Sequence, residues 1–539
     1  MTAALHQTDH PARVDPQRLL ADADQRLAAG DAAGALALFQ SAAQGPYGAY
    51  AELRRGQILH ALGQPGDARA ALLRADSLKP GDAPILFALA TVARDQGDVA
   101  TAERYYLAAM RARPQAVEPA VNLATLMRQI GRLDDAARVI ERTLQRCGEH
   151  ARLLEQLGLV ALDRNHPADA EHAFRRALAL DPDGATLHAN LAEALNDQHR
   201  WAETVAELDI AIGRLREPGQ AHLNRAYALF ELGRWAEGWV DFEHRFNRPT
   251  MAAAVRRPEH FALPRWRGEA LTGPLFVWTE QGLGDEILMG SLLPALLARN
   301  LDVVFECSPR LAPLFARSFP ALRVIARADK PDTPPAGCTA QIPAGSLFGL
   351  LDWTPQAARP VAYLKPDPAR VKAARARHPH DGRRLIGLSW ASRNPRLGTL
   401  KTLPRRALEQ LLAVPNTLFL DLQYGETAET RLALSSGAGV EIRRDVDTDV
   451  ENDIEGLAAL LAACDKVVTA SNVTAHLAGA LGIETHVVVP HGRARMWYWL
   501  GDQPASPFYP AVRIHRQAAD GSWTPAVVAL RAVLTQPTR

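Results

Sequence analysis

The stretch from Trp278 to Gly290, WTEQGLGDEILMG, brings an acidic side chain to the point where one apolar run ends and another begins. A dinucleotide-binding turn needs G-x-G-x-x-G, and the position of its third glycine holds Ile287, so that motif is excluded. What remains is a glycine turn, Gly282-Leu283-Gly284, that delivers the carboxylate of Asp285 to the start of a helix. Such a carboxylate can act as a general base, or it can only cap the helix.

A second candidate site lies in VVTASNVTAHLAGALG, which predicts a strand that ends at Ser471-Asn472 and a helix that begins near Val473. The backbone N–H groups of such a helix start are free to bind an anion, and the helix dipole favours negative charge there. The alternative is a Ser/Asn helix cap without a ligand, in which His476 is a packed imidazole.

Two further polar segments follow predicted strands. In LSWASRNPRLGTLKTLP, the cations Arg393, Arg396 and Lys401 could neutralise a diphosphate. In LQYGETAE, Glu426 or Glu429 could accept the hydroxyl groups of a ribose. Without a ligand, the same residues are solvated loop cations and first-turn acids that the helix dipole favours.

The first half of the chain must be read as a repeat, because its turn residues recur every 34 residues. A helix–turn–helix unit explains this period: a small residue lets the two helices approach, a large one fills the gap to the next pair, and proline stops the second helix. Seven units cover about residues 15–248, and such stacks usually hold a peptide or protein in their groove. The turn residues are Gly30, Gly63, Gly97, Gly131, Asn165, His199 and Gly233, the small residues include Ala35, Ala68, Ala102, Ala136 and Ala170, and the large residues are Phe39, Leu72, Tyr106, Ile140, Phe174, Leu208 and Phe242.

From about Leu271 short β-rich runs alternate with amphipathic helices, which is typical of parallel sheets covered on both faces. Two such sets predict two Rossmann-like lobes that face a cleft. Ligands of these folds bind beyond the carboxyl ends of the strands, where the four candidate segments lie. The strands are predicted at residues 275–280, 302–308, 322–327, 385–390, 417–422, 466–470 and 486–490.

Composition narrows the class of protein. Lys plus Arg (61) nearly balance Asp plus Glu (60), which argues against nucleic acid or an anionic membrane as a partner. The N-terminus lacks the apolar core of a secretory signal, and no apolar run approaches the roughly 20 residues that span a bilayer. The four cysteines are far apart, which argues against a disulfide framework or a zinc site. We therefore expect a cytoplasmic protein without a transmembrane segment or a structural metal.

Several strings carry a resemblance to known families. GQPGDARAALLRADSLKP and RNHPADAEHAFRRALALDP resemble the second helix of the tetratricopeptide repeat. LPRWRGEALTGPLFVWTEQGLGDEILMGSLLPAL, LIGLSW and SNVTAHLAGALG resemble the glycosyltransferase B (GT-B) fold, in particular the ADP-heptose:lipopolysaccharide heptosyltransferase family (glycosyltransferase family 9). Bacterial proteins that fuse such repeats to such a domain are still more similar. The expected fold is an all-α tetratricopeptide superhelix followed by an α/β GT-B domain of two lobes.

The expected domain layout follows from these patterns. It has a disordered N-terminus over residues 1–14, seven repeats over 15–248, a linker over 249–270, an N-terminal Rossmann-like lobe over 271–365, an interlobe linker over 366–383 and a nucleotide-sugar-binding C-terminal lobe over 384–539.

The resemblance also implies roles for single residues. Asp285 falls at the position of the proposed catalytic base of the heptosyltransferases. The family often has Val-Asp-Thr where this chain has Ala470-Ser471-Asn472, so one carboxylate beside the diphosphate is missing here. The residues expected to bind the donor are Gly282, Gly284, Lys401, Glu429, Ser471, Asn472, Val473, Thr474 and His476, with Arg393 and Arg396 as further candidate phosphate contacts.

The implied reaction is an inverting, metal-independent transfer of a hexosyl, heptosyl or nonulosonic acid group from a nucleotide sugar, which is a substrate, so that no cofactor is needed. The expected acceptor is a protein or peptide docked by the repeats, and flagellin is a candidate, because repeat-fused relatives are associated with protein glycosylation. The alternatives are a heptosyltransferase acting on lipopolysaccharide and a non-catalytic scaffold with a degenerate transferase fold. The aromatic residues Trp497, Tyr498 and Trp499 either form a wall for a sugar or base or pack into the core.

Overall fold

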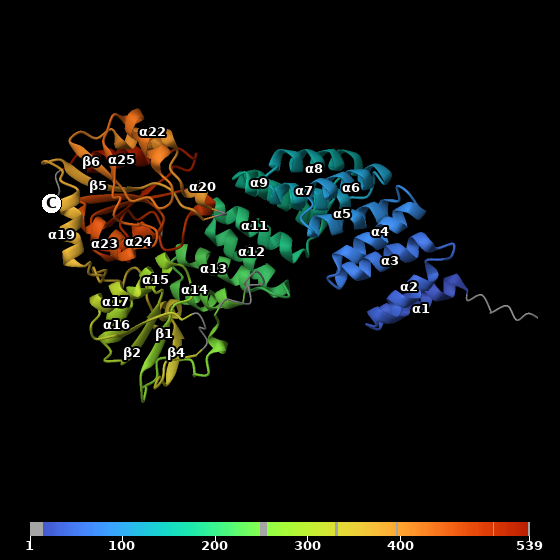
Figure 1. Cartoon of the computed structure of the whole chain (residues 1–539), viewed down its shortest axis with the longest axis horizontal. Coiled ribbons are helices and arrows are strands. Elements are labelled where there is room, and N and C mark those ends of the chain that lie inside the picture. The colour runs from blue at the N-terminus through green and yellow to red at the C-terminus, as the bar shows by residue number, and fades with distance from the viewer. Residues whose placement is uncertain (1–14, 248–255, 329–332, 395–396, 500, 537–539) are drawn as a thin grey trace, which may run out of the picture. The chain divides into compact units, whose positions relative to one another are not determined.

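The computed structural model describes residues 15–247, 256–328, 333–394, 397–499 and 501–536 (Figure 1). The predicted disordered N-terminus, residues 1–14, and the first part of the predicted linker, up to residue 255, lie outside these described residues. The chain divides into two compact units, residues 1–194 and 195–539. The boundary falls inside a repeat helix, so the later repeat helices belong to the unit that carries the sheets.

The first unit is built from consecutive helices that pack in pairs, coloured blue to teal in Figure 1. Its helices are α1 (Pro16–Ala28), α2 (Ala32–Ala42), α3 (Gly48–Ala61), α4 (Pro65–Leu78), α5 (Ala83–Asp95), α6 (Val99–Ala112), α7 (Glu118–Gln129), α8 (Leu133–Cys147), α9 (Ala151–Asp163), α10 (Pro167–Leu180) and the larger part of α11 (Ala185–Asp197).

The residue that joins the two helices of each pair has a left-handed backbone conformation. All seven predicted turn residues have φ between 60° and 84°. Five of them are glycines, which adopt this conformation without a steric penalty, while Asn165 and His199 adopt it as non-glycine residues. A left-handed residue closes the end of one helix and redirects the chain, which is why these positions keep the period of the sequence.

The small and large residues predicted to pack the repeats are buried. The five alanines that follow the turns have no exposed surface, and the seven larger residues are at most 2% exposed. The predicted packing of each helix pair is therefore confirmed at these positions.

The second unit adds further repeat helices, two sheets and the helices around them. The helices and 3-10 turns are α12 (Trp201–Arg214), α13 (Gly219–Glu231), α14 (Trp235–Phe242), η1 (Glu243–Phe246), η2 (Pro258–His260), α15 (Leu283–Gly290), α16 (Leu293–Leu297), α17 (Ala312–Ser318), η3 (Ala344–Ser346), α18 (Leu347–Leu350), α19 (Pro368–Arg377), α20 (Gly398–Lys401), α21 (Arg405–Leu412), α22 (Ala428–Ala438), α23 (Ile454–Ala463), α24 (Val473–Ala480), η4 (Gly492–Ala494) and α25 (Thr524–Leu534). The strands are β1 (Leu275–Trp278), β2 (Val303–Cys307), β3 (Arg323–Ala326), β4 (Ala340–Pro343), β5 (Arg384–Ser389), β6 (Thr417–Asp421), β7 (Ile442–Arg444), β8 (Lys466–Ala470), β9 (Thr485–Val489) and β10 (Val512–Arg516).

Both sheets are parallel throughout their described strands. The first has the strand order β3-β2-β1-β4 and the second β10-β9-β8-β5-β6-β7. The sequence predicted seven of these strands and missed β4, β7 and β10, all of which lie at sheet edges. The strands β7 and β10 carry arginines and β4 contains glutamine and proline, which removes the apolar run that marks an inner strand.

Two predicted boundaries differ from the structure. The helix predicted over EILMGSLLPALLARN is two helices, α15 and α16, because Pro294 in the first turn of α16 has no N–H to continue the earlier helix. The described part of the predicted linker, residues 256–270, packs onto the first sheet. There the Trp266 N–H donates to Gln341 O at 2.9 Å and the Gln341 N–H donates to Pro264 O at 2.9 Å.

Alternate residues of the second sheet face two different apolar layers, as expected for a sheet covered on both faces. Leu385 and Val467 face the layer that holds α23 and α24, whereas Ile386 and Val468 face the layer that holds α21 and α25. The first of these layers continues without interruption to the first sheet and to α13 and α14. Trp497, Tyr498 and Trp499 lie within it and are at most 8% exposed, so these aromatic residues pack the core.

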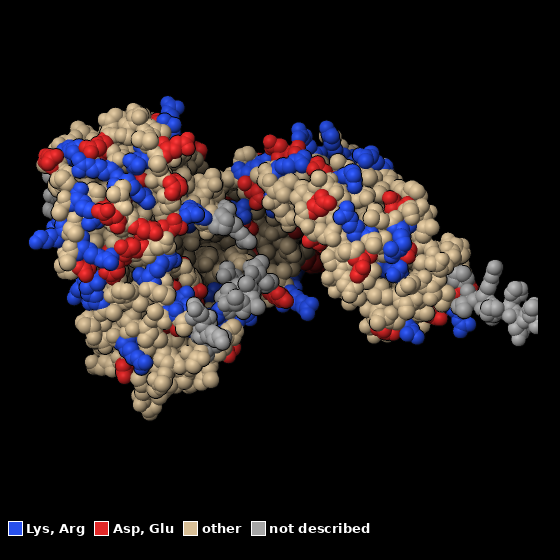
Figure 2. Space-filling model, viewed as in Figure 1, with Lys and Arg blue, Asp and Glu red and all other residues tan. Residues whose placement is uncertain are grey.

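The charged side chains do not form a field of one sign on the face shown in Figure 2. Blue and red side chains alternate across it. This agrees with the near balance of charges in the sequence.

Candidate functional site

Asp285 reaches its position through the short connection between β1 and α15. The helix begins at Leu283 with Gly282 as its N-cap, so Asp285 is the third helical residue and does not cap the helix in the usual way. Gly282 has φ −76° and ψ 168°, which any residue can adopt. The backbone conformation at position 282 therefore does not require glycine. The reason for a glycine in this turn is found at Gly284, in the residue that it contacts.

Gly284 allows the start of α15 to approach α24 closely. A β-carbon at Gly284 would lie 2.9 Å from Cδ2 of His476, inside any ordinary contact distance. The helices α15 and α24 lie next to each other in Figure 1 as well. The acidic turn and the second predicted helix start therefore meet within one compact unit.

Replacing Gly284 with Ala is expected to lower the free energy of unfolding by about 1–3 kcal/mol, the usual cost of overpacking a filled site. The matched control is Gly66→Ala, which changes the same position of a first helical turn but meets nothing within 4 Å. We expect Gly66→Ala to leave stability unchanged or to raise it. Thermal unfolding followed by circular dichroism compares the two, and equal melting temperatures would show that the His476 contact relaxes freely.

The N-cap of α24 is Asn472, and its side chain is fully used by the protein. Its Oδ1 accepts from the Thr474 N–H at 3.0 Å, and its Nδ2 donates to Ser389 Oγ at 2.8 Å and to Ala391 O at 3.1 Å. Ser471 is also engaged, because its Oγ accepts from Trp499 Nε1 at 2.8 Å. Of the residues predicted to bind the donor, Ser471 and Asn472 therefore have side chains that hold the loop, and the Asn472 backbone N–H donates to Ala470 O at 2.8 Å.

Two groups beside this helix start have no hydrogen-bond or ion-pair partner among the described residues. The Thr474 hydroxyl is buried and makes no hydrogen bond. Lys401, the last residue of α20, is 5% exposed, and its ammonium forms no ion pair within the described part of the chain. Burial lowers the pKa of Lys401, and the nearby Asp285 carboxylate opposes this effect. A buried cation, an unsatisfied hydroxyl and a helix N-terminus together suit an anion.

His476 is a packed, neutral imidazole. Its ring stacks on Trp499 with centroids 5.3 Å apart, and its Nδ1 lies 2.8 Å from the Tyr509 hydroxyl. Burial and the Lys401 ammonium lower the pKa of His476 to about 3. His476 is thus a packed imidazole, and its ring lies where the two helices meet.

Asp285 is more basic than its place at a helix start predicts. The surrounding protein raises the pKa of Asp285 to about 6, although part of the side chain stays accessible. Burial is the main cause, and Glu280 and Glu286 add to it, whereas the Gly282 backbone and Lys401 act in the opposite direction. Loss of hydration thus outweighs the lowering effect of the helix start on the pKa of Asp285.

If Asp285 acts as a general base, the pH dependence of the reaction that it assists should follow the ionisation of this carboxylate. A general base must be ionised, so kcat/KM should fall as the pH drops through about 6 and level off above it. Initial rates between pH 4.5 and 8.5, with structure monitored by circular dichroism at each pH, measure the profile. A rate that stays flat across this range would remove Asp285 from the role of base.

Among the described residues, the others predicted to bind the donor add no polar side chain to the cluster of Asp285, Lys401 and the start of α24. Arg393 is exposed and pairs with Glu451 at 2.8 Å. Glu429 is exposed in the first turn of α22, and Glu426 is exposed just before it. Val473 is partly buried at the first position of α24, and Arg396 lies outside the described residues.

Gln423 organises the end of β5 and was not predicted. Its Oε1 accepts from Ser389 Oγ at 3.1 Å and from the backbone N–H groups of Trp390 and Ala391 at 2.9 and 2.8 Å. Because Asn472 binds the same segment, the ends of β5, β6 and β8 are tied together. The only signal in the sequence is that Gln423 follows a predicted strand directly.

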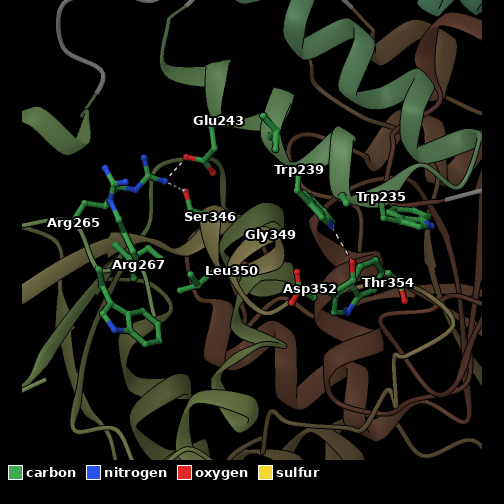
Figure 3. Close-up of a pocket in the computed structure, with 15 residues that line it drawn as sticks. Trp235, Trp239, Glu243, Arg265, Arg267, Ser346, Gly349, Leu350, Asp352 and Thr354 are labelled. Carbon is green, nitrogen blue, oxygen red and sulfur yellow. Dashed lines mark hydrogen bonds and ion pairs between the residues drawn. The ribbon is translucent and has the colours of Figure 1, made fainter. Parts of the chain in front are cut away.

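A pocket of about 650 Å³ lies between α14 and the segment after β4 (Figure 3). Arg265, Glu243 and Ser346 form a hydrogen-bonded group at one end of it, and Trp235 and Thr354 lie at the other. Trp239 donates from Nε1 to Trp353 O at 2.9 Å. The rings of Trp235 and Trp239 are at most 8% exposed, so they serve mainly as packing between the last repeat helix and the first sheet.

Within the described residues no helix has the length and apolarity required to cross a bilayer. In the same part of the chain no group of three or more His, Cys, Asp or Glu side chains is arranged to hold a metal ion.

Comparison with known proteins supports the repeats directly. The tetratricopeptide repeat family matches residues 87–151 and 155–215. A solved tetratricopeptide repeat protein from Parabacteroides merdae is 15% identical, with a TM-score of 0.37 over 44% of this chain and 94% of that one. The sequence prediction of tetratricopeptide repeats is confirmed.

Two curated relatives extend the comparison. Protein FlbA from Caulobacter vibrioides is 32% identical over 478 residues, which cover 84% of this chain and 78% of FlbA. Cellulose synthase 2 operon protein C from Komagataeibacter xylinus is 33% identical over 171 residues, which are 31% of this chain and 13% of that protein.

Proposed function

The chain belongs to the family of protein FlbA, and from this premise and the cluster around Asp285 we propose that it is a glycosyltransferase with a GT-B fold. The observation that carries the proposal is that a partly accessible, unusually basic carboxylate lies beside a helix start with a buried lysine and an unsatisfied hydroxyl. The donor is a nucleotide sugar, and the acceptor is a protein or peptide that the repeats bind.

The donor phosphates are assigned to the start of α24. Lys401 supplies an ammonium group, the Thr474 hydroxyl supplies a donor, and the N-terminal end of α24 supplies the positive pole of the helix dipole. A group built in this way stabilises the negative charge that develops on the leaving phosphate. Because burial raises the energy of an unpaired ammonium, binding of the anion also relieves a penalty that the free protein carries.

Asp285 acts in the proposal as the general base. It takes the proton from the acceptor hydroxyl as the oxygen forms a bond to the anomeric carbon and the bond from that carbon to the leaving phosphate breaks. Attack from the face opposite the leaving group inverts the configuration at that carbon. A pKa of about 6 keeps most of the carboxylate ionised at neutral pH and still makes it a better proton acceptor than an ordinary aspartate.

The repeats favour a protein acceptor, because tetratricopeptide stacks bind peptides and proteins. The second candidate function is a scaffold that binds a partner and transfers nothing. The observation that favours it is the engagement of Ser471 by Trp499, at the place where the heptosyltransferases often carry a carboxylate.

Calorimetry with UDP-, ADP- and CMP-sugars tests the proposal and separates the two candidates. We expect one donor class to bind with a dissociation constant between about 1 μM and 1 mM, the usual range of substrate affinities. The matching nucleosides, which lack phosphate, are the controls and should bind far more weakly. Silence from all three donors would contradict the proposal and favour the scaffold.

A further inference from the structure

Arg245 lies in η1, directly after the last repeat helix, and is buried to 3% exposure of its side chain. Its guanidinium is 4.6 Å from the ring centre of Phe242 and 4.2 Å from that of Phe246. Such contacts on two aromatic faces fix the plane of the guanidinium and hold its charge within the protein.

The partner of Arg245 is Glu280, which follows β1 by two residues and opens the turn that leads to Asp285. One carboxylate oxygen of Glu280 accepts from Arg245 Nε at 3.1 Å and from Nη2 at 2.9 Å. The Glu280 side chain is 2% exposed, and its second oxygen has no hydrogen-bond partner. The wall around this pair is tight, because a β-carbon at Gly345 would lie 2.7 Å from the Glu280 carboxylate.

Arg245 is also held from a second side. It donates to Ser346 Oγ at 2.9 Å and to Glu243 at 3.1 Å. Arg265 binds the same two residues, as Figure 3 shows. The guanidinium is thus part of a frame that joins the end of the repeats to the first sheet, and Glu280 connects this frame to the catalytic turn.

We propose that Glu280, clamped by Arg245, is a positioning residue that fixes the turn carrying Asp285 and sets the electrostatic environment of that carboxylate. The proposal rests on the proposed function, since it gives a transferase base its place and basicity. The last turn of the repeat region thereby becomes part of the machinery that orients the reaction.

The charged groups that face Asp285 show why Glu280 has an effect of its own. Glu280 and Glu286 raise the pKa of Asp285, and Lys401 lowers it. The Asp285 carboxylate also interacts electrostatically with the hydroxyl groups of Tyr498 and Tyr509. Burial raises the pKa values of both tyrosines, so they stay neutral. Glu286 is occupied by Arg327 and the Ser308 N–H, which leaves Glu280 as the carboxylate that the repeat region controls.

Glu280→Gln tests the electrostatic part. The amide keeps the shape and can still accept from Arg245. Burial raises the pKa of Glu280 and Arg245 opposes this effect, so the substitution removes a negative charge near Asp285 at every pH at which the carboxylate is ionised. We expect the Asp285 carboxyl to titrate at lower pH than in the wild type, and the acid limb of the rate profile to move with it. The titration is followed by NMR on protein labelled with ¹³C in the aspartate carboxyls, where the Asp285 signal is the one lost in Asp285→Asn.

The matched control is Glu243→Gln. This carboxylate also binds Arg245, but it is not among the main causes that shift the pKa of Asp285. Its Asp285 titration should equal that of the wild type. An unchanged titration in Glu280→Gln, or an equal change in both variants, would overturn the proposal.

Arg245→Met tests the positioning part, because it removes the clamp and keeps much of the side-chain volume. We expect kcat to fall at least about tenfold while the KM for the donor stays within about twofold, since misplacement of a base by an ångström can reduce rates strongly. An unchanged kcat would overturn the positioning role. A melting temperature measured for each variant shows whether the chain is folded.

The NMR titration needs no turnover. If no donor is transferred by the wild type, the proposed function fails, whereas the effect of Glu280 on Asp285 is still measured. If transfer occurs and Glu280→Gln leaves the Asp285 titration unchanged, only the further inference fails.

Discussion

Asp285→Asn is expected to reduce the rate of sugar transfer by at least about a hundredfold, the lower end of what general base catalysis contributes. The amide keeps the size of the side chain and its place in α15, but it cannot take a proton. Donor binding should change little, because the phosphates are assigned to Lys401 and the start of α24. Single-turnover rates with a saturating donor separate the chemical step from binding.

The stability of this variant gives an independent check. The folded pKa of Asp285 is about 6, above the ordinary value of 3.8, so the ionised form is disfavoured in the folded protein at neutral pH. Stability should therefore rise as the pH falls from about 6 towards 4, where the folded state takes up the proton first. Asp285→Asn should remove this dependence and melt at or above the wild-type temperature at pH 7.

A matched control for Asp285→Asn is Asp302→Asn, which changes an exposed aspartate just before β2, at the opposite end of the same sheet. Its transfer rate should equal that of the wild type. A fully active Asp285→Asn enzyme would reduce Asp285 to a residue that only stabilises its helix, and the proposed mechanism would be abandoned.

The repeats were predictable because each unit needs the same few residues. A left-handed turn, a small contact residue and a large filler recur at fixed spacing, and the structure places all three as the period requires. The inner strands were predictable for a related reason, since burial on both faces demands a continuous apolar run. The edge strands β7 and β10 are partly exposed and carry arginines, and the buried β4 is the short run AQIP, which contains a glutamine and a proline, so none of the three shows a long apolar run.

For the candidate site, the sequence predicted only those residues that directly follow a predicted strand. The rule that ligands bind beyond the carboxyl ends of parallel strands led to Asp285, Lys401 and the start of α24, which the structure brings together. It did not exclude Arg393, whose partner Glu451 comes from a distant part of the sequence. Nor could it foresee the Arg245–Glu280 pair, because two residues 35 positions apart become neighbours only when η1 packs against the turn that follows β1.

Lys401→Met is expected to weaken donor binding about tenfold to a hundredfold, because a hydrogen bond to a charged group contributes about 1.5–3 kcal/mol. Methionine keeps the apolar length of the side chain and removes the ammonium. The Kd from calorimetry is the measurement. The control is Lys365→Met, because Lys365 is an exposed lysine of the same unit, and this variant should bind the donor as the wild type does.

The free Lys401→Met protein should gain stability while it loses affinity. Burial lowers the pKa of Lys401, so the folded state disfavours the charged form, and this penalty is present at every pH below the unfolded pKa. Replacing the ammonium removes the penalty, and we expect a higher melting temperature without donor and a smaller stabilisation when donor is added. A structural lysine would show the reverse, with lower stability and unchanged affinity. An anion site that contains an unpaired buried cation should behave in this way, because the cation that binds the anion also destabilises the free protein.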